Sequence, residues 1–399
     1  MGKHIQLLAL LTAVLTILES CTPTSKLSPL PATPTFPNFL TSTTQTINQK
    51  SSGLPQSLYF LSKMDSDFDR IWKLETDATT LTQIKLDPGE IVSFDVSPIS
   101  GNLAFSIGSA LLMTEGDKSI PIFEGTRGQC SSDGNISADL VGCESINSVY
   151  WSPDGKNLAF SSGGVLYLYK LSTMKYTQVL PDQVNSKNIP GTIYQPYSWS
   201  PDSQKILVEM DLPVQGSTLG VYSLASQQIV WLKAPDDDLV CCQASWSVNS
   251  ELIFVSNFYL TVDSPTGLWQ FIAANGIGTT LVPSIDSDST YNFAGWPFLT
   301  PDNQLLYFFA NSPSLPEDQI PLSMVASPED NLGDRRIIRS EAVMPQEVLW
   351  ARDGSLAIIV QAGPGATQWM RGGPVILMRI NNSPAIPLVS EGFQLRWGP

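Results

Sequence analysis

Short apolar segments alternate with tight polar turns along most of the chain, and one such unit recurs. The clearest copies are VYWSPDGKNLAFSS at Val149–Ser162 and YSWSPDSQKILVEM at Tyr197–Met210. Each copy predicts a strand, a tight turn and a second strand, because its apolar runs are short and rich in β-forming residues. Weaker copies lie at Phe94–Ile107, Ala244–Ser256, Pro297–Ala310 and Val348–Val360.

The turn inside each copy has a physical basis. In Ser152-Pro153-Asp154-Gly155, proline presets φ, serine can bond to the backbone, and glycine accepts a positive φ. We expect the aspartates at the third turn position to bond turn amides, a structural role: Asp154, Asp202, Asp302 and Asp353. We expect the tryptophans that end the first strands to pack between repeats: Trp151, Trp199, Trp246 and Trp350.

Two more strands follow each turn unit, so that four strands repeat together. The centres of the second strands run from Ala104 to Ala357 at spacings of 46 to 55 residues, near the roughly 40–50 residues of a propeller blade. A further second strand at Ser57–Leu61 lacks its first strand, and Phe393–Trp397 at the other end of the chain supplies one. The sequence therefore predicts an all-β fold, a β-propeller of seven four-stranded blades closed by the C-terminal strand, which joins the N-terminal blade. Six or eight blades are the alternatives.

The W-S-P-D-G turn followed by an apolar strand resembles the TolB-like, WD40-like (PD40) propeller repeat family. The resemblance extends over residues 55–399. It implies a propeller fold and protein–protein contact in the cell envelope. Because one fold serves many functions, the resemblance indicates fold more strongly than function.

The first 54 residues have a different character. Lys3 and His4 precede an apolar run at Ile5–Leu18, which has the length of a signal-peptide core and is short for a membrane span. The segment that follows, Leu18-Glu19-Ser20-Cys21, resembles the bacterial lipobox, although Glu19 replaces the usual small or apolar residue. This resemblance implies that Cys21 is acylated and becomes the N-terminus.

The segment after Cys21 is rich in Pro, Thr, Ser and Asn and has few apolar residues. Such a composition predicts an extended, disordered linker. The predicted organisation is a lipoprotein signal peptide at 1–20, a lipid-anchored linker at 21–54 and a β-propeller domain at 55–399. We expect an exported protein that is held at the membrane by its lipid alone.

Charge and composition limit the chemistry that the chain can perform. Its net charge of −15 disfavours nucleic acid and anionic lipid heads as partners. The one histidine is His4, inside the predicted signal, so the mature protein lacks Ser-His-Asp catalysis and His-ligated zinc. We therefore expect no enzyme, no metal and no cofactor. A carboxylate pair that acts on glycans, or acids that bind calcium, is the alternative.

Four cysteines follow the predicted lipobox, and an exported protein can oxidise them. Cys130 and Cys143 bracket a polar loop that a disulfide would restrain, while Cys241 and Cys242 are adjacent. The adjacent pair is open to three interpretations: a vicinal disulfide, two thiols, or cross-pairing with the earlier cysteines.

The long connections between predicted strands all belong to one face of the propeller, opposite the short turns, and loops usually carry a propeller's function. Their aromatic residues are Tyr194, Tyr197, Phe258, Tyr259, Tyr291, Phe293 and Trp369. Their acids include Asp236, Asp237, Asp238, Asp286, Asp288, Glu317 and Asp318. Such residues suit a protein or peptide partner, or a glycan, and also fit loop packing and solubility alone. The candidate binding residues are Tyr194, Asp236, Asp237, Tyr291 and Trp369.

The lipobox generates the first prediction. Mass spectrometry of the mature protein should find an acylated Cys21 at the N-terminus, and Cys21→Ala should release the protein from membranes. An unmodified N-terminus at another residue would contradict the lipobox assignment.

Overall fold

The computed structural model describes residues 53–86, 89–125, 145–181, 192–212, 216–235, 242–257, 266–286, 288–314, 320–329, 334–363, 371–381 and 383–399. The chain divides into two units, Met1–Lys50 and Ser51–Pro399. All described residues belong to the second unit, so the predicted signal peptide, Cys21 and nearly all of the linker lie outside them. Within these ranges, no helix combines the length and apolarity that a membrane crossing would need.

The second unit is built from antiparallel sheets. Five sheets have four strands each, and their strands are β4 (Ser93–Val96), β5 (Leu103–Ile107), β6 (Ala110–Glu115) and β7 (Lys118–Glu124); β8 (Val149–Trp151), β9 (Asn157–Ser162), β10 (Val165–Lys170) and β11 (Lys175–Leu180); β12 (Ile193–Trp199), β13 (Lys205–Leu212), β14 (Gly216–Ser223) and β15 (Gln228–Trp231); β16 (Gln243–Trp246), β17 (Leu252–Ser256), β18 (Leu268–Ile272) and β19 (Gly278–Val282); and β20 (Tyr291–Leu299), β21 (Gln304–Ser312), β22 (Leu322–Pro328) and β23 (Arg336–Val343).

A sixth sheet joins the two ends of the second unit. It has seven strands in the order β24 (Pro345–Trp350), β25 (Leu356–Gln361), β26 (Gly373–Arg379), β27 (Ile386–Trp397), β1 (Leu58–Ser62), β2 (Arg70–Leu74) and β3 (Leu81–Gln83). We call it the chain-end sheet.

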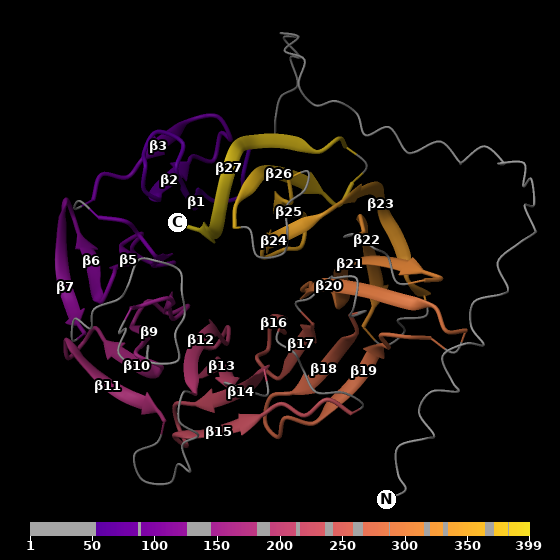
Figure 1. Cartoon of the computed structure of the whole chain (residues 1–399), viewed down its shortest axis with the longest axis horizontal. Coiled ribbons are helices and arrows are strands. Elements are labelled where there is room, and N and C mark those ends of the chain that lie inside the picture. The colour runs from indigo at the N-terminus through magenta and orange to yellow at the C-terminus, as the bar shows by residue number, and fades with distance from the viewer. Residues whose placement is uncertain are drawn as a thin grey trace, which may run out of the picture. The chain divides into compact units, whose positions relative to one another are not determined.

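Strand β27 takes part in two strand pairings along its length. Its first half pairs with β26, with Ile386 opposite Leu377 and Gly392 opposite Gly373. Its second half pairs with β1, with Phe393 opposite Leu61 and Trp397 opposite Leu58. Figure 1 shows this strand in yellow as it passes from β26 to the indigo strands of the N-terminal part. The expected pairing of the C-terminal strand with the unpaired N-terminal strand is therefore present.

Each four-stranded sheet resembles a propeller blade, and we call it a blade. Within a blade the strands pair in sequence order, as in β4-β5-β6-β7. Figure 1 shows the sheets following one another around a common centre, with β7, β11, β15 and β19 on the outside. We call the first strand of each blade an inner strand, and we use the same name for β24 and for the second half of β27 in the chain-end sheet, which also lie near the centre.

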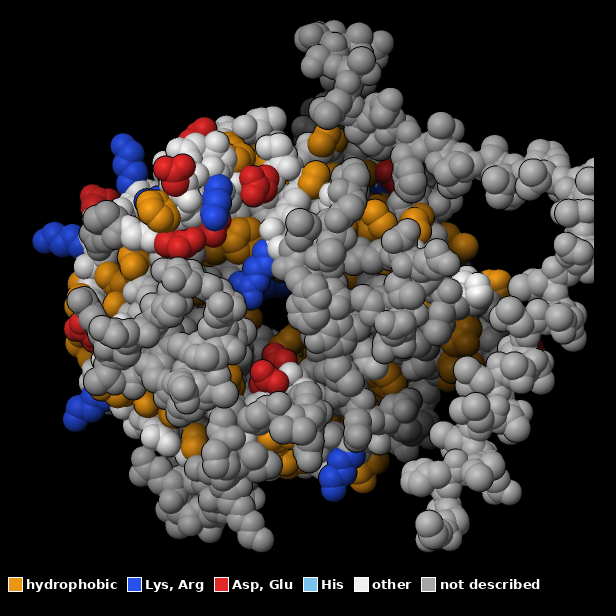
Figure 2. Space-filling view, in the orientation of Figure 1, with side chains coloured by type: hydrophobic (Ala, Val, Ile, Leu, Met, Phe, Trp, Pro, Cys, Tyr) orange, Lys and Arg blue, Asp and Glu red, His pale blue; other side chains and the backbone are white. Residues whose placement is uncertain are grey.

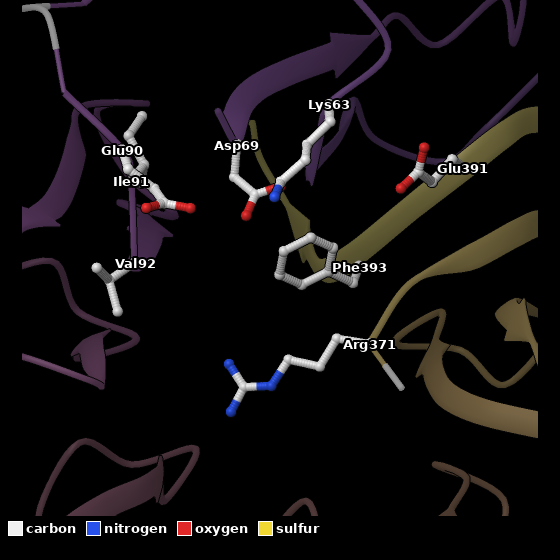
Figure 3. A pocket seen from close by; sticks show the side chains of 8 residues that line it. All are labelled: Lys63, Asp69, Glu90, Ile91, Val92, Arg371, Glu391 and Phe393. Carbon is white, nitrogen blue, oxygen red and sulfur yellow. The ribbon is translucent and has the colours of Figure 1, made fainter. Parts of the chain in front are cut away.

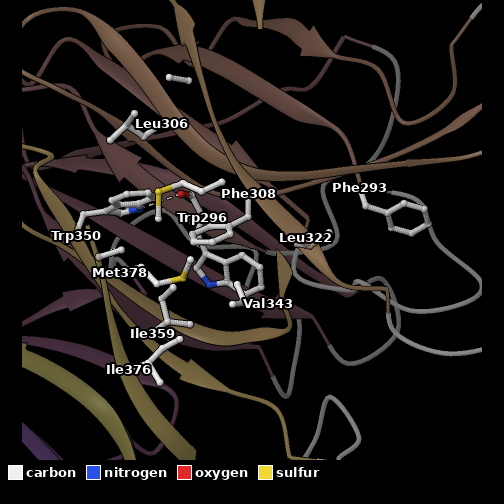
Figure 4. Close-up of a cluster of buried hydrophobic side chains, with 13 residues drawn as sticks. Phe293, Trp296, Leu306, Phe308, Leu322, Val343, Trp350, Ile359, Ile376 and Met378 are labelled. Carbon is white, nitrogen blue, oxygen red and sulfur yellow. Dashed lines mark hydrogen bonds between the residues drawn. The ribbon is translucent and has the colours of Figure 1, made fainter. Parts of the chain in front are cut away.

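Large apolar side chains fill the space between neighbouring sheets. One cluster joins the blade of β20–β23 to the chain-end sheet through Phe308, Trp350 and Ile359, all buried. In Figure 4 the Trp350 indole lies in this cluster, with a dashed hydrogen bond to Trp296. Burying such side chains is the main favourable contribution to folding.

Several tryptophans that end inner strands also donate hydrogen bonds to the neighbouring inner strand, in addition to packing as expected, whereas the buried indole N–H of Trp151 has no acceptor in the described structure. Among the described residues these indole bonds run from Trp199 to the Tyr150 carbonyl (3.0 Å), from Trp246 to the Ser198 hydroxyl (3.2 Å), from Trp350 to the Trp296 carbonyl (3.0 Å) and from Trp397 to the Trp350 carbonyl (2.8 Å). The apolar face of each ring can therefore pack between sheets while its N–H group is satisfied.

The aspartates of the short turns bond within their own turns. Asp154 accepts a hydrogen bond from the Ser152 hydroxyl at 2.7 Å and one from the Lys156 amide at 3.1 Å. Asp202 and Asp353 also accept hydroxyl and amide donors, and Asp302 accepts the Thr300 hydroxyl. The Asp154 and Asp202 backbone amides donate to serine hydroxyls of the next blade's turn.

The shared strand generates the second prediction. Deleting residues 392–399 removes the neighbour of β1 and exposes the edge of Leu58, Phe60 and Leu61, whose side chains are fully buried. We expect the truncated protein to aggregate or to melt lower by about 10 °C or more, which corresponds to the loss of several kcal/mol. Differential scanning calorimetry measures this, and an unchanged melting temperature would show that β27 contributes little.

Candidate functional site

The sequence-predicted binding residues do not meet in one described site. Asp236, Asp237 and Trp369 lie outside the described residues. Tyr194, near the start of β12, is half-buried against the core around Trp199, and its burial raises the pKa of its hydroxyl. Tyr291 packs against the cluster of Phe293 and Phe308.

Two aromatic residues that we expected on exposed loops belong to the core instead. Phe293 is fully buried in β20. The Tyr197 hydroxyl accepts a hydrogen bond from the Ala244 amide at 2.9 Å. Both lie on long inner strands. A proline or glycine near the middle of each strand interrupts the apolar run, and for that reason the sequence pattern indicated a loop where the strand begins.

The cysteines add little to the described site. Cys130, Cys143 and Cys241 lie outside the described residues, and Cys242 is buried beside Trp246 in the core between two blades. Each disulfide pairing considered above therefore stays a prediction.

A pocket of about 350 Å³ opens where the two ends of the second unit meet. Its lining residues are Lys63, Asp69, Glu90, Ile91, Val92, Arg371, Glu391 and Phe393 (Figure 3). They come from four segments: the β1–β2 connection, the segment before β4, the segment before β26, and β27. These segments lie on the side of the sheets opposite the short aspartate turns, which is the face that the sequence predicted for binding. Figure 2 shows side chains of both charges gathered near the central hollow of this face.

The pocket has a partly apolar floor and a charged rim. The floor consists of Ile91, which is buried, and of Asp69, Val92 and Phe393, which are half-buried. The rim consists of four exposed side chains, two cationic and two anionic: Lys63, Arg371, Glu90 and Glu391. The rim charges therefore balance, and the floor carboxylate of Asp69 is the one charge left over.

Hydrogen bonds from neighbouring residues hold the pocket walls together. The Ile91 amide donates to the Asp69 carbonyl at 3.4 Å, and the Arg70 guanidinium donates to the Gly89 carbonyl. The Gln394 side chain donates to the Val92 carbonyl at 3.0 Å. The segment before β4 is thereby tied both to the N-terminal strands and to β27.

Asp69 has an unusual environment for a carboxylate. Its Oδ1 atom is buried and accepts no hydrogen bond. Burial raises the pKa of Asp69 above its usual value, and Glu90 and Glu391 raise it further, whereas Lys63 and Arg371 oppose the increase. The Asp69 side chain therefore includes an acceptor atom that has no donor and is closed to solvent.

A second charged group lies further along β27, among the inner strands. The Arg396 Nε lies 3.2 Å from Asp95 Oδ1, and its guanidinium lies 5.1 Å from the centre of the Tyr150 ring. Glu347 accepts a hydrogen bond from the Leu395 amide at 2.7 Å. Burial raises the pKa of both Asp95 and Glu347, while Arg396 counteracts it in each case. These contacts join four inner strands, and the charged side chains in them interact with one another.

Sequence reasoning missed the pocket because it searched the longest connections. The β1–β2 connection has only seven residues, but it carries aspartates at alternate positions, Asp65, Asp67 and Asp69. That acidic run was the available signal. In the part of the chain that the structure describes, no group of three or more His, Cys, Asp or Glu side chains is placed to hold a metal ion.

No protein-family model and no curated protein matches the sequence. Among solved structures, a protein from Lactobacillus plantarum is similar at a TM-score of 0.52 and 14% identity, covering 86% of this chain and 99% of that one. The fold resembles TolB-like propellers. TolB from Acinetobacter baumannii matches at a TM-score of 0.41 and 13% identity over 69% of this chain, which spans 62% of the TolB chain. A putative TolB from Agrobacterium tumefaciens matches at 0.44 and 14% identity, covering 71% of this chain and 94% of that one. At these identities the likeness is one of fold alone.

The charges around Asp69 generate the third prediction. Glu391→Gln should lower the pKa of the Asp69 carboxyl, because it removes a negative neighbour, and Arg371→Gln should raise it, because it removes a positive one. Carbon NMR of protein labelled at aspartate Cγ measures both shifts. Equal or absent shifts in the two variants would mean that these side chains do not face Asp69.

Proposed function

We propose that this protein is an exported lipoprotein whose seven-bladed propeller binds a protein or peptide partner and performs no catalysis. The observation that carries the proposal is the open pocket on the long-loop face, formed by four separate segments with a charged rim and an aromatic ring in its floor. Such a mixture of an aromatic anchor and surrounding polar groups suits recognition of a polypeptide.

The seven-bladed architecture follows if the chain-end sheet is divided within β27. Residues 386–392 would then complete a blade with β24, β25 and β26, and residues 393–397 would be the inner strand of a blade with β1, β2 and β3. Two such blades and the five four-stranded sheets make seven. In this interpretation β27 closes the ring.

Lipidation and envelope localisation rest on the lipobox at Leu18–Cys21 and on the Pro- and Thr-rich segment after it. An acylated Cys21 would hold the propeller near a membrane, and a linker over residues 21–54 would let it reach partners there.

Phe68 gives the pocket an exposed apolar neighbour. Its side chain is 50% exposed, directly beside Asp69 in the β1–β2 connection. Large exposed aromatic side chains beside a pocket are typical of contact surfaces between proteins. Because Phe68 does not itself line the pocket, it would serve as a contact for a partner that extends beyond the rim.

A carbohydrate-active propeller is the second candidate function. Its support is that three carboxylates, Asp69, Glu90 and Glu391, line one pocket, and that burial raises the pKa of Asp69, as a general acid requires. Lys63 and Arg371 alternate with these acids, and this favours binding of charged groups over hydrolysis of a neutral glycan.

The fourth prediction tests the binding face. A photo-crosslinking amino acid at Phe68 should capture a protein or peptide partner in intact cells, as mass spectrometry of the adducts would show. The same amino acid at Ile99, 68% exposed in a short turn of the opposite face, is the matched control and should capture none. Capture at Ile99 alone would overturn the proposed face. Adducts with glycan and no protein at Phe68 would favour the second candidate.

A further inference from the structure

The pocket has one buried acceptor that nothing in the described structure satisfies. The Asp69 carbonyl accepts the Ile91 amide, which fixes the backbone, but the Oδ1 atom of its side chain has no donor. A buried carboxylate oxygen without a donor costs free energy, and native sites of this kind usually receive a partner. Because Oδ1 is closed to solvent while Asp69 lines the pocket, a ligand that supplies an N–H donor and a positive charge would reach this oxygen after a rotation of the Asp69 side chain.

The rim charges indicate that the missing partner is a single cation. The lining has two cationic side chains, Lys63 and Arg371, and three carboxylates, Asp69, Glu90 and Glu391, so its net charge is −1 even though Lys63 partly offsets the charge of Asp69. Among the described residues, neither Lys63 nor Arg371 lies within ion-pair distance of the Asp69 carboxylate; the ion pairs that form there join other side chains. An anionic ligand would be repelled by three carboxylates. A divalent metal ion would lack the ligand cluster that it needs, because the described residues contain none.

The apolar part of the floor indicates what carries the cation. Phe393, Val92 and Ile91 surround the carboxylate with an aromatic ring and two aliphatic side chains (Figure 3). An aliphatic stem can pack on such surfaces while its charged end reaches an acid, and an aromatic face also attracts a cation. A volume of about 350 Å³ lies near the lower end of the roughly 300–1,000 Å³ of small-ligand pockets, which suits one long side chain.

We propose that this pocket binds a lysine or arginine side chain of a polypeptide partner, with the cationic end on Asp69 and the aliphatic stem on Phe393. This inference rests on the proposed binding function and specifies its ligand. The partner would present the side chain from an exposed segment, because the pocket holds one side chain and its charged rim contacts the flanking backbone.

The fifth prediction tests the ligand with three fluorescent heptapeptides of glycine and serine whose central residue is lysine, arginine or norleucine. Norleucine keeps the aliphatic stem and removes the charge. The binding is measured by fluorescence polarisation with the purified full-length protein. The two cationic peptides should bind about tenfold or more tightly than the norleucine peptide, as expected for a charged hydrogen bond to a half-buried carboxylate.

Two substitutions in one loop separate the pocket from general electrostatics. Asp69→Asn should weaken binding of the lysine peptide about tenfold, whereas Asp65→Asn should change it less than twofold. Asp65 is the matched control because it is exposed in the same connection, carries the same charge and does not line the pocket.

A third substitution in the same connection, Lys63→Gln, should tighten binding by roughly threefold, because it removes a repulsive rim charge. Impaired folding could not produce a tighter complex.

The outcomes distinguish this inference from the proposed function. Equal binding of the norleucine and lysine peptides, or equal effects of Asp69→Asn and Asp65→Asn, would overturn the cationic ligand while leaving peptide binding in place. Butylamine that competes as strongly as the lysine peptide would assign the site to small amines and overturn the polypeptide source. Absence of binding by every peptide, together with no capture at Phe68, would overturn both.

Discussion

Contacts between neighbouring inner strands hold the sheets of this molecule in place, and the tryptophan indoles provide the recurring one. Each such indole is large enough to fill the wedge between two sheets, and its N–H group would be costly to bury without an acceptor. Donation to the adjacent inner strand solves both problems at once, as between Trp350 and Trp296. The same geometry recurs at Trp397, so the last strand joins its neighbour by the contact that joins internal blades.

The position of β27 follows from that contact, and the pocket follows from β27. Phe393, Arg396 and Trp397 lie within five residues of one another, yet they serve the pocket floor, the buried ion pair with Asp95 and the indole contact with Trp350. Separating a largely buried ion pair leaves an uncompensated charge, so the contact of Arg396 with Asp95 favours the observed register of β27. The pocket is therefore preorganised by interactions that lie outside it.

The sequence predicted the fold far better than the site. The strand–turn–strand repeat and the turn aspartates depend on local patterns, which a short window of sequence contains, and the pairing of Phe393–Trp397 with the first strand follows from counting those repeats along the chain. The pocket instead combines Lys63, Arg371 and Phe393, which come from opposite ends of the chain and become neighbours only through the shared strand. Loop length was a poor guide, because the seven-residue β1–β2 connection supplies the pocket carboxylate.

The distribution of charge would allow an acidic protein to have the selective cation site proposed above. A net charge of −15 spread over the surface attracts any cation weakly, and salt screens that attraction. Asp69 differs because its Oδ1 atom is removed from water while the surrounding rim is neutral overall. Its interaction with a bound cation would be screened less than that of a surface acid and would require the right shape as well as the right charge. Discrimination would then reside in one half-buried carboxylate and the ring beside it.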